Sequence, residues 1–245
     1  MMSADPKEKL VDATKSYLEM LKISGVSELM LKTADSSSVP PTTLIQQPEE
    51  QTIFTSDRKQ TLLELRDAVQ ICTKCSELSS TRTQTVFGAG YVKAQLVFVG
   101  EAPGFDEDRQ GLPFVGKAGQ LLTKMIEAIE MKRSEVFICN VLKCRPPQNR
   151  NPKPEEVINC EPYLWAQLDV IKPKLICALG NFAAQTLLKT TKSISQLRGI
   201  IHESHGYRII CTFHPAYLLR NPDDKKKAWE DLKRVRAELN SEQSL

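Results

Sequence analysis

Four short apolar runs constrain the fold of this chain more than any other feature of its sequence. The runs are rich in Val, Ile and Phe, and they are near-continuous rather than alternating, which is typical of strands buried on both faces. They are QLVFVG (95–100), EVFICNV (135–141), KLICALG (174–180) and YRIICTF (207–213). Helical patterns lie between or after them, at 119–131, 163–171 and 227–239. This alternation predicts a three-layer α/β/α domain with a central, four-stranded, mainly parallel sheet.

Polar residues follow each expected strand at the point where the apolar run ends. The first run is followed by Glu101 and the loop APGFDEDRQG, and Asn140 closes the second. Asn181 follows the third run and His214 follows the fourth. Ligands bind open α/β sheets in the crevice at the carboxyl ends of the strands. These residues therefore predict one site, walled by the loop, Asn140 and His214.

The N-terminal part of the chain differs in pattern from the rest. Residues 1–32 include a helical stripe of apolar residues, which predicts an amphipathic extension that either packs on the domain or binds a protein partner. Residues 33–60 are rich in Ser, Thr, Pro and Gln and have little periodicity, which is typical of a flexible linker. The main domain is expected over residues 61–240.

Charge is unevenly distributed along the chain. Residues 1–56 hold five lysines and eight acidic residues, whereas the remainder holds 28 basic and 22 acidic residues. A mildly basic body fits an anionic partner such as nucleic acid. No apolar run is long enough to span a bilayer and no secretory signal is evident, so we expect a cytoplasmic location. We also expect the protein to be a monomer.

The seven cysteines fall into two groups. Their odd number, without a secretory signal, argues against a disulfide framework. Four of them offer enough thiolates for a 4Fe-4S cluster or a tetrahedral zinc ion: Cys72 and Cys75 in a C-x2-C pair, with Cys144 and Cys160. The other three lie inside expected strands, as small core residues do: Cys139, Cys177 and Cys211. Spacing alone leaves iron–sulfur, zinc and unligated thiols open.

Several motifs resemble those of the family 4 uracil-DNA glycosylases, the iron–sulfur type. The motifs are GEAPGFDEDRQGLPFVGKAGQLL, CNVLKCRPP, ALGNFAAQTLL and FHPAYLLR. The likeness covers about residues 60–237 and is specific, because the motifs recur in order at suitable separations. It implies a uracil-DNA glycosylase-like fold and hydrolytic removal of uracil from DNA. It also implies a 4Fe-4S cluster, with zinc as the alternative, held by Cys72, Cys75, Cys144 and Cys160.

The resemblance further implies roles for individual residues. His214 matches the catalytic histidine, which stabilises negative charge near O2 of the departing uracil. Asn140 matches the residue that reads the edge of the flipped base, and Phe114 matches the aromatic residue that stacks on it. The rival hypothesis is a non-catalytic, metal-braced nucleic-acid-binding protein on the same scaffold. The presence of all three residues favours the enzyme.

Glu101 is the second catalytic candidate, as a group that orders water or binds near the sugar. Gly100 and Ala102 are expected to bind substrate beside it. Ala102 stands where family 1 enzymes, with GQDPYH, have an aspartate that acts on water. Gly104 stands where the same motif has a tyrosine that blocks the thymine methyl group, so the sequence does not explain how thymine is excluded.

The motif FHPAYLLR suits a finger that enters DNA. Leu218 and Leu219 would wedge into the gap left by the flipped base, although either could equally be a core residue. Arg220 and Arg145 would contact phosphate, and the proline-braced loop from Arg145 to Lys153 would follow the DNA backbone. A related X-type subfamily traps uracil covalently through a histidine in this region. KCRPPQNRNP contains none, so we expect turnover.

Overall fold

The computed structural model of the protein describes residues 49–241, with side chains from residue 57 onward. The extension expected over residues 1–32 and the first part of the linker lie outside these residues. The described chain folds around a six-stranded sheet with the strand order β1-β3-β2-β4-β6-β5. None of the helices in this part of the chain is long and apolar enough to cross a membrane.

The four strands expected from the apolar runs form the parallel centre of the sheet, as predicted. They are β2 (Leu96–Gly100), β3 (Phe137–Asn140), β4 (Leu175–Leu179) and β6 (Tyr207–Thr212). Every residue of β2, β3 and β4 is buried, as strands covered on both faces require. The buried strand residues include Cys139, Cys177 and Cys211, which confirms their expected place in the core.

Two short edge strands that the sequence did not predict extend this centre to six strands. β1 (Ala89–Gly90) pairs antiparallel with β3, and β5 (Ile201–Ser204) pairs antiparallel with β6. β1 has only two residues, and β5 alternates exposed and partly buried positions. Neither strand therefore has the continuous apolar run that revealed the other four.

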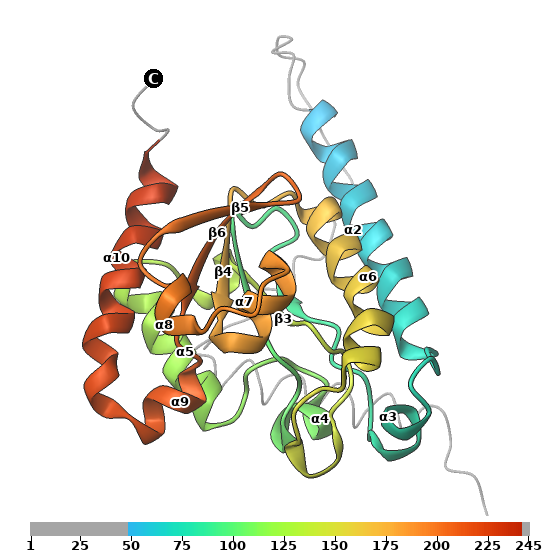
Figure 1. Cartoon of the computed structure of the whole chain (residues 1–245). Coiled ribbons are helices and arrows are strands. Elements are labelled where there is room, and N and C mark those ends of the chain that lie inside the picture. Colours follow the sequence, from blue (N-terminus) through green and yellow to red (C-terminus); the bar gives the residue numbers. More distant parts are fainter. Residues whose placement is uncertain (1–48, 242–245) are drawn as a thin grey trace, which may run out of the picture. The chain divides into compact units, whose positions relative to one another are not determined.

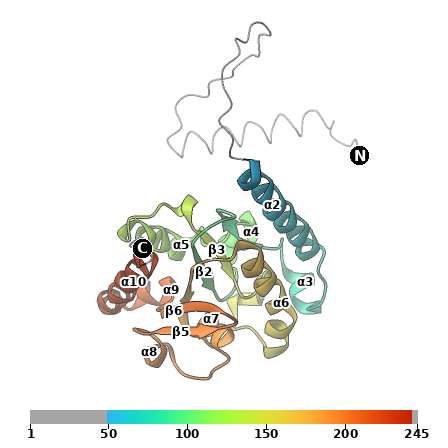
Figure 2. The ribbon, with the colours of Figure 1, turned by 90° about the horizontal axis from the view of Figure 1, so that it is seen from above.

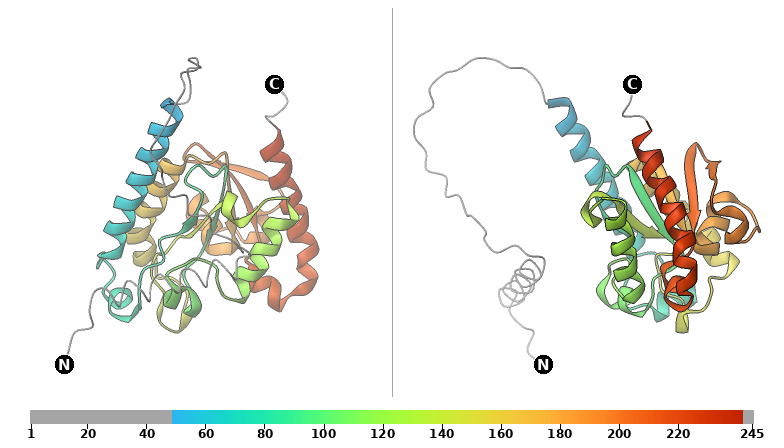
Figure 3. Two further views of the ribbon diagram at one scale, coloured as in Figure 1. Left: turned by 180° about the vertical axis from the view of Figure 1, so that it is seen from behind. Right: turned by 90° about the vertical axis from the view of Figure 1, so that its left-hand side faces the viewer.

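Helices cover both faces of the sheet and complete the three expected layers (Figures 1 and 2). On one face, α5 (Lys117–Ala128) and α10 (Lys225–Asn240) lie side by side (Figure 3). On the other face lie α6 (Pro154–Ile171) and α7 (Gly180–Leu188), and α2 (Glu49–Gln70) packs against α6. The shorter helices are α3 (Ser76–Thr81), α4 (Phe105–Gln110), α8 (Ile194–Leu197) and α9 (Pro215–Arg220). Single 3-10 turns occur at Arg133–Glu135, Pro147–Asn149 and Pro222–Asp224.

The flexible linker expected over residues 33–60 is wrong for residues 49–60, because these residues begin α2. Farther along this helix, Leu62 and Val69 are buried in the hydrophobic core. The guanidinium of Arg58 donates to the backbone carbonyl of Ile171, at the end of α6, over 3.3 Å. The sequence RKQTLLELRDAVQIC predicts a helix from residue 58, and packing against α6 stabilises a helix that begins earlier, within the expected linker.

The carboxyl ends of the parallel strands open toward the end of the sheet where α3, α4 and α9 gather (Figure 1). The chain passes from β2 directly into the loop before α4, and from β6 into α9. The strand order reverses at β2, which has β3 on one side and β4 on the other. Such a switch point is where open α/β sheets bind ligands.

Candidate active site

A cavity of about 430 Å³ opens at the carboxyl ends of the parallel strands. Its walls come from the loop after β2, the end of β3, the proline-rich loop that follows, and α9. The cavity brings together Glu101, Phe114, Asn140 and His214, which are far apart in the sequence. Asn181 serves a different purpose, since its side chain accepts a hydrogen bond from the backbone N–H of Ile194 at 2.6 Å.

His214 is the N-cap of α9, and a backbone hydrogen bond fixes its ring. The N–H of Ala216 donates to Nδ1 of His214 over 3.1 Å. Because Nδ1 accepts, the neutral ring holds its proton on Nε2, which remains able to donate. Burial, and then the positive charge of Arg220, lower the pKa of His214 to about 4. The imidazole is therefore neutral at physiological pH.

Asn140 presents an unpaired acceptor to the cavity. The residue is 1% exposed, and its Oδ1 is buried without a hydrogen-bond partner. An unsatisfied buried oxygen costs about 1–3 kcal/mol, so a ligand that donates here gains affinity. Gly100 preserves the space around it. A Cβ at Gly100 would lie 2.4 Å from Oδ1 of Asn140 and 2.6 Å from the ring of Phe114.

Phe114 adopts a backbone conformation that is uncommon for an aromatic residue. Its φ of +53° lies in the left-handed region, which non-glycine residues rarely occupy. Its ring centroid lies 5.6 Å from that of His214, with 34° between the two planes. The ring is therefore placed to cover one face of a planar ligand that also contacts the imidazole.

Glu107 fixes the loop that holds Phe114, a role that the sequence did not reveal. Its Oε1 accepts from the backbone N–H groups of Val115 and Gly116 over 2.9 and 3.1 Å. Its Oε2 accepts from the N–H of Gly104 over 3.1 Å, which caps α4. The three bonds tie the residues after Phe114 to the start of α4, and Glu107 itself lines the cavity.

Glu101 and Ala102 line the cavity directly after β2. Burial raises the pKa of the Glu101 carboxyl above its usual range. A carboxyl group with a raised pKa suits general acid–base chemistry near neutral pH. Ala102 adds only a methyl group to the wall, so Glu101 is the carboxylate at this strand end.

The residues expected to contact DNA differ in how exposed they are. Arg220 lines the cavity, and Leu219 beside it is 43% exposed. Arg145 lies on the proline-rich loop, where its Nε donates to Oδ1 of Asn149 over 2.7 Å. Leu218 is only 1% exposed, so the prediction that it wedges into DNA is wrong. The side chain of Leu218 packs in the hydrophobic core, and the next residue of α9, Leu219, is exposed instead.

Ion pairs hold the proline-rich loop in place. Arg150 lines the cavity and pairs with Glu77 of α3 over 2.8 Å and with the buried carboxylate of Glu156 over 2.5 Å. Lys153 also pairs with Glu77, over 2.7 Å. These two cations were expected to face the DNA backbone, but they pair with carboxylates that lie outside the quoted motifs. The pairs connect the cavity wall to the segments around the cysteines.

Four cysteines from three segments of the chain line a second, smaller cavity: Cys72, Cys75, Cys144 and Cys160. No set of three or more His, Cys, Asp and Glu side chains within residues 49–241 is arranged to hold a single metal ion. A tetrahedral zinc site needs all four sulfurs at about 2.3 Å from one point. Four cysteine thiolates are also the ligand set of an iron–sulfur cluster, so the donor set itself suits either group.

Donors surround these sulfurs. Arg82 donates to Sγ of Cys144 over 3.1 Å, and the backbone N–H of Lys143 donates to Sγ of Cys160 over 3.2 Å. Asn159 donates to a third sulfur over 3.6 Å. N–H···S hydrogen bonds stabilise thiolate ligands and tune iron–sulfur clusters. Arg82 lies outside every motif, so only the structure identifies it.

Comparison with known proteins agrees with this geometry. Residues 87–233 match the model of the uracil DNA glycosylase superfamily. The chain is 45% identical over 175 residues to the type-4 uracil-DNA glycosylase of Archaeoglobus fulgidus, which covers 68% of this chain and 87% of that protein. It is 43% identical over 180 residues to the type-4 uracil-DNA glycosylase of Thermotoga maritima, which covers 72% and 93% of the two chains.

A more distant relative is the type-5 uracil-DNA glycosylase of Pyrobaculum aerophilum. It is 30% identical over 148 residues, which cover 53% of this chain and 64% of that protein. The type-4 relatives are thus matched over more of their length and at higher identity. The chain belongs to the uracil-DNA glycosylase superfamily and, within it, to the type-4 uracil-DNA glycosylases.

Proposed function

We propose that the protein flips uracil out of single- or double-stranded DNA and hydrolyses its N-glycosidic bond, leaving an abasic site for base excision repair. Water supplies a hydroxyl group to the sugar carbon and a proton to the released base. The observation that carries this proposal is the convergence of Phe114, Asn140 and His214 on one cavity of about 430 Å³. The volume is within the range of small-ligand sites.

The base is recognised by its face and by its edge. The ring of Phe114 stacks on the flipped pyrimidine. The unpaired Oδ1 of Asn140 accepts from N3–H of uracil, while its Nδ2 donates to O4. Cytosine has an acceptor at N3 and a donor at its exocyclic nitrogen, which is the opposite pattern.

His214 stabilises the leaving group. Breaking the glycosidic bond leaves an electron pair on N1 of uracil, and the negative charge spreads to O2. The Nε2–H of His214, held in place by Ala216, donates to O2 as this charge develops. Glu101, at the end of β2, orders the attacking water. At the mouth of the cavity, Arg145 and Arg220 contact phosphate and Leu219 fills the gap in the stack. The protein acts as a monomer.

The depressed pKa of His214 gives a test by titration. The folded protein binds fewer protons than the unfolded chain between pH 4 and pH 6.5, so this group lowers stability as the pH falls through that window. In spectra of the protein with carbon-13-labelled histidine, we expect one imidazole of the three to stay neutral down to about pH 4. That signal should be missing from His214→Ala. Titration of all three near pH 6.5 would contradict the buried neutral ring.

We further infer that Cys72, Cys75, Cys144 and Cys160 hold a 4Fe-4S cluster, which when bound supplies a structural brace between segments distant in sequence. The N–H groups of Arg82, Lys143 and Asn159 stabilise the thiolate ligands. Glu77 follows Cys75 by two residues and pairs with Arg150 of the cavity wall. The brace is thereby connected to the substrate cavity.

Replacing one of these cysteines should remove the cluster. For purified Cys160→Ala we expect the loss of bound iron, inorganic sulfide and brown colour, together with a lower melting temperature. The control is Cys177→Ala, which changes a cysteine buried in β4 and should keep its iron and sulfide. Full iron and sulfide in Cys160→Ala, or zinc in place of iron in the natural protein, would refute the assignment.

The activity itself is tested with a labelled oligonucleotide that contains one uracil. Incubation followed by alkali should cut the strand at that position and release free uracil, whereas matched strands with cytosine or thymine should stay intact. A cross-link that survives detergent and heat would contradict turnover. Binding without scission would identify the non-catalytic nucleic-acid-binding protein instead.

A further inference from the structure

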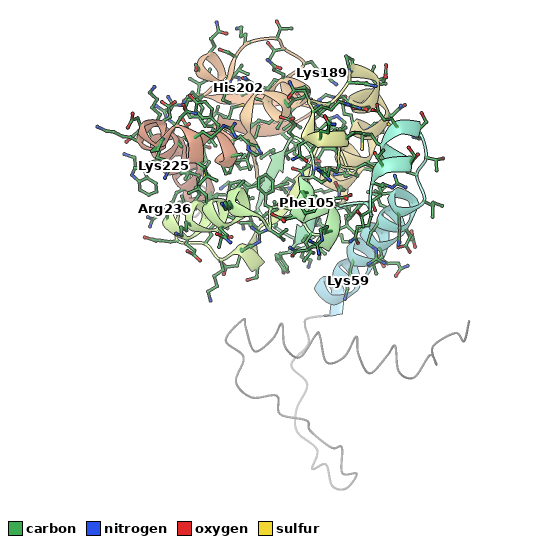
Figure 4. All side chains as sticks on the ribbon, turned by 90° about the horizontal axis from the view of Figure 1, so that it is seen from below. Lys59, Phe105, Lys189, His202, Lys225 and Arg236 are labelled. Atoms are coloured by element: carbon green, nitrogen blue, oxygen red, sulfur yellow. The ribbon has the colours of Figure 1, made fainter. Side chains whose placement is uncertain are left out.

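Phe105 is an exposed aromatic residue at the rim of the cavity. It is the first residue of α4 and is 51% exposed, whereas most large apolar side chains of this domain are buried. It directly follows Gly104, which lines the cavity. In the view from below, Phe105 lies near the middle of the face of the domain (Figure 4).

Two cations flank this ring. The guanidinium of Arg109, one turn farther along α4, lies 5.6 Å from the ring centroid. The guanidinium of Arg145, from the proline-rich loop, lies 5.1 Å from it. Both distances are within the range of cation–π contacts. Arg145 also donates a hydrogen bond to Asn149, which lines the cavity, so Arg145 links the Phe105 ring to the proline-rich wall of the site.

Proteins bind single-stranded nucleic acid with surfaces that combine aromatic rings and cations. Bases stack on aromatic side chains without sequence preference, and arginines nearby bind the backbone. Phe105 directly follows Gly104 of the cavity wall and is exposed, so its ring lies beside the opening through which the strand on either side of a flipped uracil must pass.

We propose that Phe105, flanked by Arg109 and Arg145, is a stacking platform for the base next to the flipped uracil in single-stranded DNA. This inference rests on the proposed function and names the substrate form that gains most from it. In a duplex the neighbouring base is already paired and stacked within the helix. In a single strand it lacks a partner, so stacking on Phe105 orders the strand.

The test compares substrates as well as variants. Phe105→Ala should raise KM for a single-stranded uracil oligonucleotide about tenfold, with kcat and duplex cleavage nearly unchanged. Two further single strands each lack one base beside the uracil, on the 5′ or the 3′ side. On one of these two strands the KM of the natural protein should rise by about the same factor, and the KM of Phe105→Ala should rise no further. If the KM of both proteins rose equally on both strands, the proposal would be overturned.

Two measurements separate stacking from a structural role of the ring. Tyr91→Ala is the matched control, because Tyr91 is 48% exposed and its N–H bonds to Val136, beside the amino end of β3. It should leave every substrate unaffected. Phe105→Trp should show fluorescence quenching by uracil-free single strands, and no quenching would count against the platform. That binding signal does not need catalysis, so a protein that releases no uracil would refute the proposed function while leaving this inference testable.

Discussion

Replacing His214 with alanine is expected to lower kcat for uracil release about 10²–10³-fold, with little change in KM. The reason is that the Nε2–H of His214 acts on charge that exists only as the glycosidic bond breaks. The hydrogen bond from Ala216 sets this tautomer, and burial keeps the ring neutral, so the donor is already in place before substrate binds. Single-turnover kinetics on a single-stranded uracil oligonucleotide measure the effect.

The matched control for this variant is His202→Gln. His202 lies on the edge strand β5 and bonds to the carbonyl of Leu197 over 2.7 Å, and it does not line the cavity. This variant should retain the natural rate. If His214→Ala released uracil as fast as the natural protein, another group would have to stabilise the leaving group.

Replacing Asn140 with aspartate should reduce uracil excision about a hundredfold or more. A carboxylate only accepts hydrogen bonds, so it would face O4 of uracil, which is also an acceptor. The site is 1% exposed, so the new charge would also be poorly solvated. Because the exocyclic amino group of cytosine can donate to a carboxylate, the ratio of uracil to cytosine excision should fall as well. Competition between the two substrates in one reaction measures this ratio.

Asn181→Asp is the control for the added charge. Asn181 is exposed, its side chain accepts from the backbone N–H of Ile194, and a carboxylate keeps that bond. Its activity should equal that of the natural protein. An unchanged uracil-to-cytosine ratio in Asn140→Asp would mean that another group reads the base.

The central sheet and the three main site residues were predictable from sequence for a physical reason. Strands buried on both faces must be apolar throughout, so the four runs stand out without any knowledge of their partners. Parallel strands end at one edge, so Asn140 and His214, each at a strand end, had to lie near each other. Phe114 was expected through the family motif alone, since an aromatic residue in a loop is as often part of the core.

The errors and omissions concern contacts between distant segments. Leu218 and Leu219 are neighbours of the same type, and only the packing of α9 decides which one is exposed. The role of Glu107 depends on a loop that folds back on α4, and sequence cannot show that fold. Arg150 lies on the loop that was expected to follow the DNA backbone, but it pairs with Glu77, 73 residues away, and with the buried Glu156. In each case the local pattern was compatible with two environments, and tertiary packing selected one.

The most direct measurement is a crystal structure of the iron-loaded protein with free uracil. We expect the base to stack on Phe114, with Asn140 within about 3 Å of N3 and O4 and Nε2 of His214 within about 3 Å of O2. Uracil bound elsewhere, or bound in the cavity with its O2 edge turned away from His214, would contradict the account.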